Sequence, residues 1–209
     1  MNSLIVDCSA GMSLYLMTEH GDYCVIDENE KRHSDELLVS LDELLKKACL
    51  KISNIDHICV CIGPGSFTGI RVAVSICKGL AIGAKAKVYV LSNLDIYEID
   101  KVKKSALVLD GFSEFLYVRV FDEKNFFDKC ISISDLKLMY DNEEIDIFAC
   151  NEKVQKKLNN YEIICKNAKL NIKNAFLSKI NKQESINLNQ INPLYLRASQ
   201  AEIERNKKN

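Results

Sequence analysis

The chain has 209 residues, of which 47% are hydrophobic and 27% charged, and its formal net charge is −1. This composition is typical of a globular protein of one domain or two small lobes, and it excludes a protein drawn to nucleic acid or membranes by its overall field. The charge is uneven, because residues 1–150 hold 16 basic and 24 acidic side chains, whereas residues 151–209 hold 12 and 5. We interpret the basic end as a solvated face, with a weak contact to RNA or to an acidic partner as the alternative.

Two antiparallel hairpins and a helix are expected in the first 50 residues. Apolar runs at 3–8, 12–17 and 23–26 are separated by short turns that contain glycine. Ser34 is the expected N-cap of the helix. Leucines then recur at helical spacing and form one apolar stripe: Leu37, Leu38, Leu41, Leu44 and Leu45.

A buried strand, a glycine-rich loop and a second helix follow. Residues 57–62 are apolar on both faces, as a central strand would be, and a helix is expected from Ile70 to Ile82, ending at Gly83. A further strand is expected at 88–91. Three hairpin-linked strands followed by helix, strand, helix and strand predict a mixed α/β layer.

The pattern of the first residues then repeats. Residues 107–111 form an apolar run that ends in Asp110 and a glycine, as residues 4–7 end in Asp7 before a glycine turn. A third strand near 126–133, a short helix capped by Ser134 and a strand at 145–150 are expected after it. We therefore expect two lobes of related topology, at 1–100 and 101–209.

The glycine-rich loop is the first candidate site. Three of the eight glycines and one of the two prolines lie between Gly63 and Gly69, before a helix N-terminus whose free N–H groups favour an anion. The candidate anion-binding or nucleotide-binding residues are Asp7, Gly63, Gly65, Ser66, Thr68, Gly69, Arg71 and Asp110. A tight structural turn is an equally good interpretation of the glycines, and Asp7 is more often a turn cap than a phosphate ligand.

Other chemistry finds little support in the sequence. His20, His33 and His57 are isolated, so no metal site is predicted. The nine cysteines include no Cys-x-x-Cys pair, and we expect them to pack as small apolar side chains in a reducing compartment, the cytoplasm. Ser66 lacks the surroundings of a nucleophile. No signal segment is expected, and the apolar runs are expected to be too short to cross a bilayer.

The two helices of the first lobe are the second candidate site. The helix at 70–82 is apolar almost all round, so it must be covered on most sides. A second subunit is expected to cover part of it. The expected interface residues are His33, Leu37, Leu38, Leu41, Leu44, Leu45, Val72, Ile76 and Leu80.

A family resemblance extends over most of the chain. The run from Gly63 to Arg71, Gly-Pro-Gly-Ser-Phe-Thr-Gly-Ile-Arg, continues to Lys78-Gly79-Leu80-Ala81 and resembles the signature of the TsaB (YeaZ) family. The opening residues 4–9, the helix start at 32–38, residues 109–118 and the tract at 193–197 resemble that family in the same order. Residues 134–190 agree only in length and general character.

The resemblance implies a fold and a function. The fold would be that of the actin-like ATPases (ribonuclease H-like), with two lobes of mixed sheets. The protein would be a non-catalytic subunit that forms a heterodimer with TsaD through the two N-terminal-lobe helices and acts with the ATPase TsaE. The complex would transfer threonylcarbamoyl to the adenosine beside the anticodon of tRNA. No cofactor of its own is implied, and weak nucleotide binding at the partner boundary stays open.

The residues leave two alternative functions open. The first is a phosphate-handling ATPase or kinase that uses Asp7, Asp110 and the Gly63–Gly69 loop, although the turn after Asp7 lacks the Lys or Gln usual in that superfamily. The second is a peptidase. In isolation the exposed helix face should pair with itself, so a homodimer is expected.

Overall fold

The computed structural model describes residues 1–27, 33–100, 104–122, 125–143 and 145–197, although the side chains of 33–35 and 143 lie outside that description. The chain forms two compact units, Met1–Asn93 with Lys173–Leu194 and Leu94–Ile172 with Tyr195–Asn209. This division differs from the expected single boundary after residue 100, because residues 173–194 return to the first unit.

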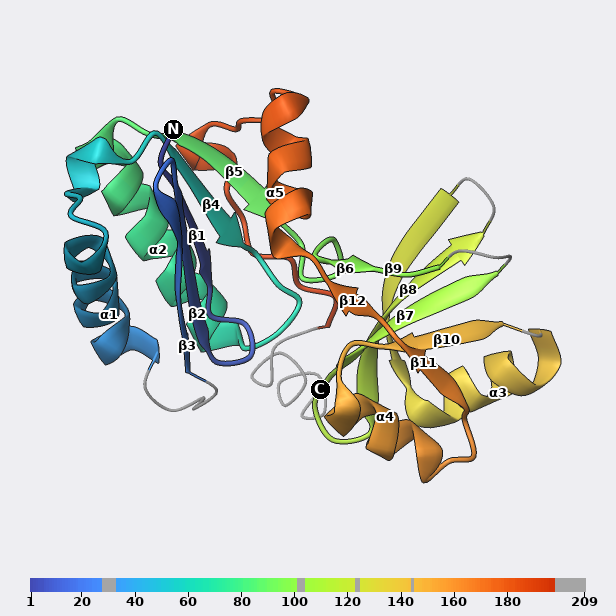
Figure 1. Ribbon diagram of the computed structural model, residues 1–209. Helices are drawn as coiled ribbons and strands as arrows, with labels where there is room; N and C mark the ends of the chain where they lie inside the picture. Colours follow the sequence, from blue (N-terminus) through green and yellow to red (C-terminus); the bar gives the residue numbers. More distant parts are fainter. Residues whose placement is uncertain (28–32, 101–103, 123–124, 144, 198–209) are drawn as a thin grey trace, which may run out of the picture. The chain divides into compact units, whose positions relative to one another are not determined.

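The first unit is built on a five-stranded mixed sheet (Figure 1). The order β3-β2-β1-β4-β5 joins β1 (Ser3–Asp7), β2 (Met12–Thr18), β3 (Gly21–Asp27), β4 (His57–Cys61) and β5 (Lys87–Leu91). The first three strands are antiparallel hairpins, whereas β1, β4 and β5 run parallel. Both predicted hairpins are confirmed. Strand β4, apolar apart from His57, is an inner strand between β1 and β5, and its last four residues are buried, as its pattern indicated.

Helices cover both faces of this sheet. Figure 1 shows α1 (His33–Lys47) and α2 (Phe67–Ala84) on one face and α5 (Ile172–Asn181) on the other. Phe176 of α5 is fully buried and meets the ring of Tyr89 edge-on, with centroids 5.6 Å apart. After α5, Ile186 N–H donates to Val88 O at 2.9 Å, which ties the returning segment to the edge strand β5. Burial of Phe176 is the reason that the late segment belongs to the first unit.

Both helix boundaries of α2 differ from the prediction. The helix begins at Phe67, three residues early, because Ser66 is its N-cap and accepts a hydrogen bond from Gly69 N–H at 3.2 Å. It continues through Gly83 to Ala84 and ends at Lys85, which adopts the left-handed conformation with φ 54°. Similarly, α1 begins at His33, so Ser34 lies inside the helix, and its side chain is outside the described residues.

The second unit repeats the topology of the first. Its sheet has the order β11-β10-β7-β8-β9, with β7 (Ser105–Asp110), β8 (Phe115–Asp122), β9 (Asn125–Ser132), β10 (Asp146–Ala149) and β11 (Cys165–Asn167). Strands β7, β8 and β9 are antiparallel, while β10 is parallel to β7 and β11. The repeat inferred from the two Asp-ending strands is therefore confirmed.

Short elements complete the second unit. They are α3 (Ile133–Glu143), α4 (Glu152–Asn159) and the two-stranded sheet of β6 (Tyr97–Glu98) and β12 (Lys169–Leu170). The cap of α3 is Ser132 rather than Ser134: Asp135 N–H donates to Ser132 Oγ at 3.0 Å, and the Ser132 hydroxyl contacts the Asp135 carboxylate at 2.7 Å. The hydroxyl and carboxylate satisfy each other in a reciprocal cap, which Ser134 could not form from within the helix.

Helix α2 is the most apolar of the helices in the described part of the chain. By length and composition alone it could cross a membrane. The expectation from the sequence concerned uninterrupted apolar runs, and Arg71 and Lys78 interrupt the apolar residues of this helix. Because Ile70, Ala73 and Cys77 are fully buried against a sheet within the same unit, α2 has the packing of a core helix of an α/β layer.

Candidate functional site

The Gly63–Gly69 loop lies directly on the turn that follows β1. Ser66 N–H donates to Ser9 O at 2.7 Å. A Cβ atom added to Gly65 would lie 2.4 Å from Ser9 O, and one added to Gly69 would lie 1.9 Å from Cys8 O. These glycines are therefore required for close approach of two backbone segments.

The polar groups of Ser66 are engaged in holding the loop together. Ser66 Oγ accepts from Gly69 N–H, and Ile70 N–H donates to Ser66 O at 3.0 Å. Thr68 and Arg71 are exposed, and the Arg71 guanidinium lies 6.0 Å from the centroid of the Phe67 ring. The structure thus brings all the loop candidates together, and it gives the Ser66 hydroxyl the role of a helix cap.

Asp7 lies beside this loop and caps its own turn. Its Oδ1 accepts from Ser9 N–H at 2.9 Å. This is the turn geometry that Asp favours, and it matches the cap interpretation made from the sequence. A carboxylate at this position also opposes binding of an anion to the neighbouring helix N-terminus.

Asp110, the counterpart of Asp7, belongs to the second unit and has different partners. Its carboxylate forms ion pairs with Lys153 at 2.8 Å and with Lys157 at 3.2 Å, both on α4. Burial alone would raise the pKa of Asp110, but hydrogen bonds from the two lysines hold it below its ordinary value. Neither lysine was among the residues predicted from the sequence, although their spacing of four places both on one helix face.

We expect Asp110→Asn to destabilise the protein by about 1 to 2 kcal/mol at neutral pH, because Lys157 would lose its charged partner. Because the folded-state pKa of Asp110 is lowered, its contribution is present above about pH 4 and is lost as pH falls through the folded value. Urea unfolding of the wild type and of Asp110→Asn between pH 3 and 7 measures the difference in their free energies of unfolding. A stability difference that does not shrink below pH 4 would contradict the assignment.

The leucine stripe of α1 faces its own sheet. Leu37, Leu41, Leu44 and Leu45 are between 1% and 7% exposed and belong to the core of the first unit. Their assignment to a partner interface is therefore corrected. An apolar stripe of this kind can pack against a partner or against its own sheet, and here it packs in the core of its own unit. The side chain of His33 lies outside the described residues.

Other aliphatic side chains of α1 and α2 are exposed. Leu38, Val39 and Ile82 are 51%, 59% and 68% exposed. Val72, Ile76 and Leu80 are partly buried at the margin of the core. The sequence did not point to Val39 and Ile82, because the spacing of apolar residues along a helix identifies only its dominant apolar stripe.

Small residues also lie on the exposed side of α2. Ser75, Gly79 and Gly83, spaced four apart, are all exposed, and a Cβ atom added to either glycine would meet nothing within 4 Å. Residues four apart share one helix face. The combination of open glycines with flanking aliphatic side chains would let a second helix approach closely.

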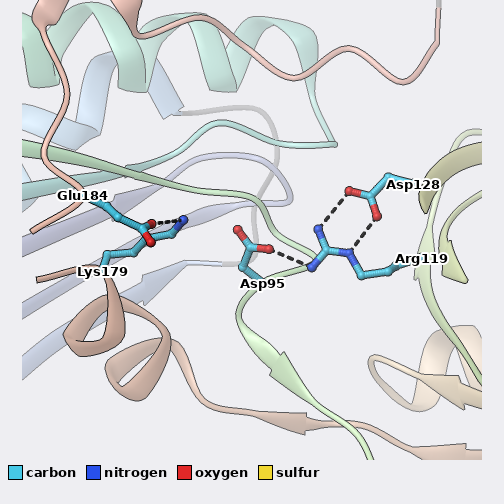
Figure 2. Close-up of polar contacts among 5 residues, drawn as sticks. All are labelled: Asp95, Arg119, Asp128, Lys179 and Glu184. Atoms are coloured by element: carbon cyan, nitrogen blue, oxygen red, sulfur yellow. Dashed lines mark hydrogen bonds and ion pairs between the residues drawn. The ribbon is translucent and has the colours of Figure 1, made fainter. Parts of the chain in front are cut away.

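A buried ion cluster was also missed by sequence reasoning. Figure 2 shows the Arg119 guanidinium between Asp128, which it contacts at 2.7 and 2.9 Å, and Asp95 at 2.7 Å. Burial would lower the pKa of Arg119, but the two carboxylates raise it, and the Phe126 ring centroid lies 4.2 Å from the guanidinium. Asp95 follows the passage out of the first unit, so this cluster anchors the start of the second one. The other pair in Figure 2, Lys179 with Glu184 at 2.8 Å, closes the turn after α5.

Nucleophiles and metal ligands are not assembled in the part of the chain described. No group of three or more His, Cys, Asp or Glu side chains there could hold a metal ion. Burial raises the pKa of the Cys8 thiol to about 12 and of the Cys150 thiol to about 11, and it raises that of Cys77. These thiols stay protonated and unreactive. His57 begins β4, whereas Ser66 follows the end of that strand, so the two cannot form a catalytic pair.

Comparisons with known proteins agree on one family. The family model described as "TsaD: tRNA N6-adenosine threonylcarbamoyltransferase" matches residues 25–131. A Haemophilus influenzae protein described as "tRNA threonylcarbamoyladenosine biosynthesis protein TsaB" is 30% identical over 128 residues, which cover 58% of this chain and 54% of the relative. The Escherichia coli protein of the same description is 31% identical over 64 residues, 31% of this chain and 28% of the relative. The chain thus spans about half the length, or less, of these curated relatives in the matched regions.

Solved structures extend the likeness to the whole fold. A Pseudomonas aeruginosa protein described as similar to peptidase YeaZ superposes with a TM-score of 0.73 at 20% identity, covering 94% of this chain and 99% of that one. YeaZ from Pseudomonas aeruginosa superposes with a TM-score of 0.72 at 19% identity, covering 93% and 99%.

Two mixed sheets with the same strand order, each opened by a hairpin whose first strand ends in Asp, define an α/β protein of the actin-like, ribonuclease H-like class. The glycine loop that packs on the first of these turns is compatible with that class. The Asp7 carboxylate of the turn and the Ser66 hydroxyl of the loop are both engaged in caps within the fold. The chain belongs to the TsaD-type family, and within it to the TsaB (YeaZ) family, which is involved in biosynthesis of threonylcarbamoyladenosine in tRNA.

Proposed function

We propose that this chain is a non-catalytic subunit that pairs with a TsaD-type catalytic subunit in the cytoplasm. The complex transfers threonylcarbamoyl to the adenosine next to the anticodon of tRNA, with a TsaE-type ATPase as a further member. The observation that carries the proposal is the exposure of aliphatic side chains on both α1 and α2, where Leu38, Val39 and Ile82 are each more than half exposed.

This face suits a helical partner. Aliphatic side chains that gather on a surface favour burial against another protein. Gly79 and Gly83 leave open space beside them, so a partner helix can lie close to the α2 backbone. Without the partner, the same face would pair two copies of this chain, and we propose a homodimer as the isolated form.

The candidate catalytic groups support a role without chemistry of its own. Asp7 caps a turn and Asp110 is held by two lysines, so both carboxylates are occupied within the fold. Ser66 caps α2. None of these groups therefore needs a cofactor. We propose that any nucleotide binds weakly, at the boundary with the partner.

We expect Gly79→Leu to weaken association with the TsaD-type partner at least tenfold, about 1.4 kcal/mol. A Cβ atom at Gly79 meets nothing in the folded chain, and leucine favours a helix over glycine by roughly 0.5 to 1 kcal/mol, so the fold is retained. The new side chain fills the space that the partner helix needs. Co-purification and sedimentation velocity measure the heterodimer and the homodimer.

The matched control is Ser178→Leu, which places the same side chain at an exposed position of α5. It should leave both associations unchanged. A folded Gly79→Leu variant that still forms both dimers with wild-type affinity would remove the proposed interface. Turnover of magnesium-ATP or cleavage of a protein by the isolated chain would instead favour the kinase or peptidase alternative.

A further inference from the structure

The turn between β7 and β8 displays two aromatic rings on the surface of the second unit. Phe112 is 60% exposed and Phe115 is 40% exposed. The turn is tightly built, because Phe115 N–H donates to Phe112 O at 3.0 Å and a Cβ atom at Gly111 would lie 2.3 Å from Phe115 O. The backbone that carries both rings is therefore held in one conformation.

A guanidinium group accompanies these rings. The Arg197 guanidinium carbon lies 5.3 Å from the centroid of Phe112 and 5.2 Å from that of Phe115, within the range of a cation–π contact. No carboxylate forms an ion pair with Arg197 among the residues that the structure describes. In the described part of the chain the contacts of the Arg197 guanidinium are with the faces of the two rings.

Two lysines contact the same turn. Lys157 Nζ donates to Ser113 O as well as to Asp110, and Lys153, which is 75% exposed, shares the Asp110 carboxylate. The other carboxylate of the turn, Glu114, accepts from the Tyr161 hydroxyl. Three cations therefore face two carboxylates, and Tyr161, which is 37% exposed, adds a third ring.

We propose that this turn, with Phe112, Phe115, Arg197, Lys153 and Lys157, is a contact site for single-stranded RNA. Exposed rings that stack bases, surrounded by Lys and Arg that meet phosphates, are the features by which proteins bind unpaired nucleotides. Charge complementarity favours a polyanion over an apolar peptide, because the rings are bordered by cations rather than by aliphatic side chains. The identification of the RNA as a loop of tRNA rests on the proposed function.

The test uses fluorescence anisotropy with the full chain and a labelled 15-nucleotide single-stranded RNA at low salt. Phe112→Leu keeps an apolar side chain but removes the ring, so we expect affinity to fall about tenfold with an unchanged salt slope. Arg197→Gln should reduce the slope of log K against log salt by about 0.7, because one phosphate contact is lost. A merely structural role would not separate these two responses.

Phe127→Ala is the matched control. Phe127 is 41% exposed on β9 and lies 4.5 Å from Lys129 Nζ, but it belongs to another part of the sheet. The control should bind RNA as the wild type does. The inference is overturned if the wild-type chain does not bind, if Phe127→Ala weakens binding equally, or if an apolar peptide or an anionic vesicle binds this surface in place of RNA. Co-purification of Phe112→Leu with the TsaD-type partner separates failure of this inference from failure of the proposed function.

Discussion

Gly69→Ala is expected to destabilise the protein by at least about 3 kcal/mol, or to prevent its folding. The added methyl group would lie 1.9 Å from Cys8 O, and the neighbour is backbone rather than a flexible side chain. Cys8 follows β1, which is paired with β2 and β4 on its two sides, so the backbone there cannot retreat. Overpacking of this kind typically costs 1 to 3 kcal/mol, and a rigid backbone neighbour places this case at or beyond the upper end. Thermal and urea unfolding measure the loss.

Gly79→Ala and Gly83→Ala are the controls within the same helix. Neither added Cβ atom meets anything within 4 Å, so both substitutions should stabilise the protein by roughly 0.5 to 1 kcal/mol through helix propensity. The three substitutions are chemically identical and differ only in surroundings. Equal effects at all three positions would refute the close packing of the loop on the Cys8–Ser9 turn.

Arg119→Met is expected to destabilise the protein by about 3 to 5 kcal/mol. The guanidinium side chain is 8% exposed, and its removal would leave Asp128, 16% exposed, and Asp95, 29% exposed, without their cation. Lysine is not an adequate replacement, because Arg119 uses two nitrogens on Asp128 and a third on Asp95. Guanidinium unfolding, followed by circular dichroism, measures the change.

An exposed ion pair provides the comparison for Arg119. Lys46 and Asp42 lie on α1 with side chains 74% and 62% exposed. Lys46→Met should therefore change stability by less than about 0.5 kcal/mol. Adding Asp128→Asn to Arg119→Met should recover part of the lost stability, because one uncompensated carboxylate is removed. A small effect of Arg119→Met would mean that the cluster is solvated rather than buried.

Local patterns predicted the elements well and their partners poorly. The hairpins, the buried β4 and the repeat beginning at Asp110 follow from alternation and turn residues within short windows. Of the predicted interface leucines of α1, all but Leu38 were misassigned, because helical spacing identifies a buried stripe without identifying what buries it. Phe176 gave no sign that α5 belongs with β5, since 87 residues separate it from Tyr89.

The candidate sites show the same division. The glycine loop was found because glycine and proline concentrate there, and its backbone contact with Ser9 could not be read from spacing. Lys153 and Lys157 resemble any solvated lysines until Asp110 is placed beside them. Arg119 lies in an otherwise apolar strand, and only the pairing of β8 with β9 brings Asp128 opposite it.

The return of residues 173–194 to the first unit, followed by Tyr195–Asn209 of the second, makes both units discontinuous in sequence. During synthesis the ribosome must therefore release residues 94–172 of the second unit before Phe176 is available to cover Tyr89. The order of translation thus requires most of the second unit to be made before the first can be completed, and leaves the last segment of the second unit to be made after it.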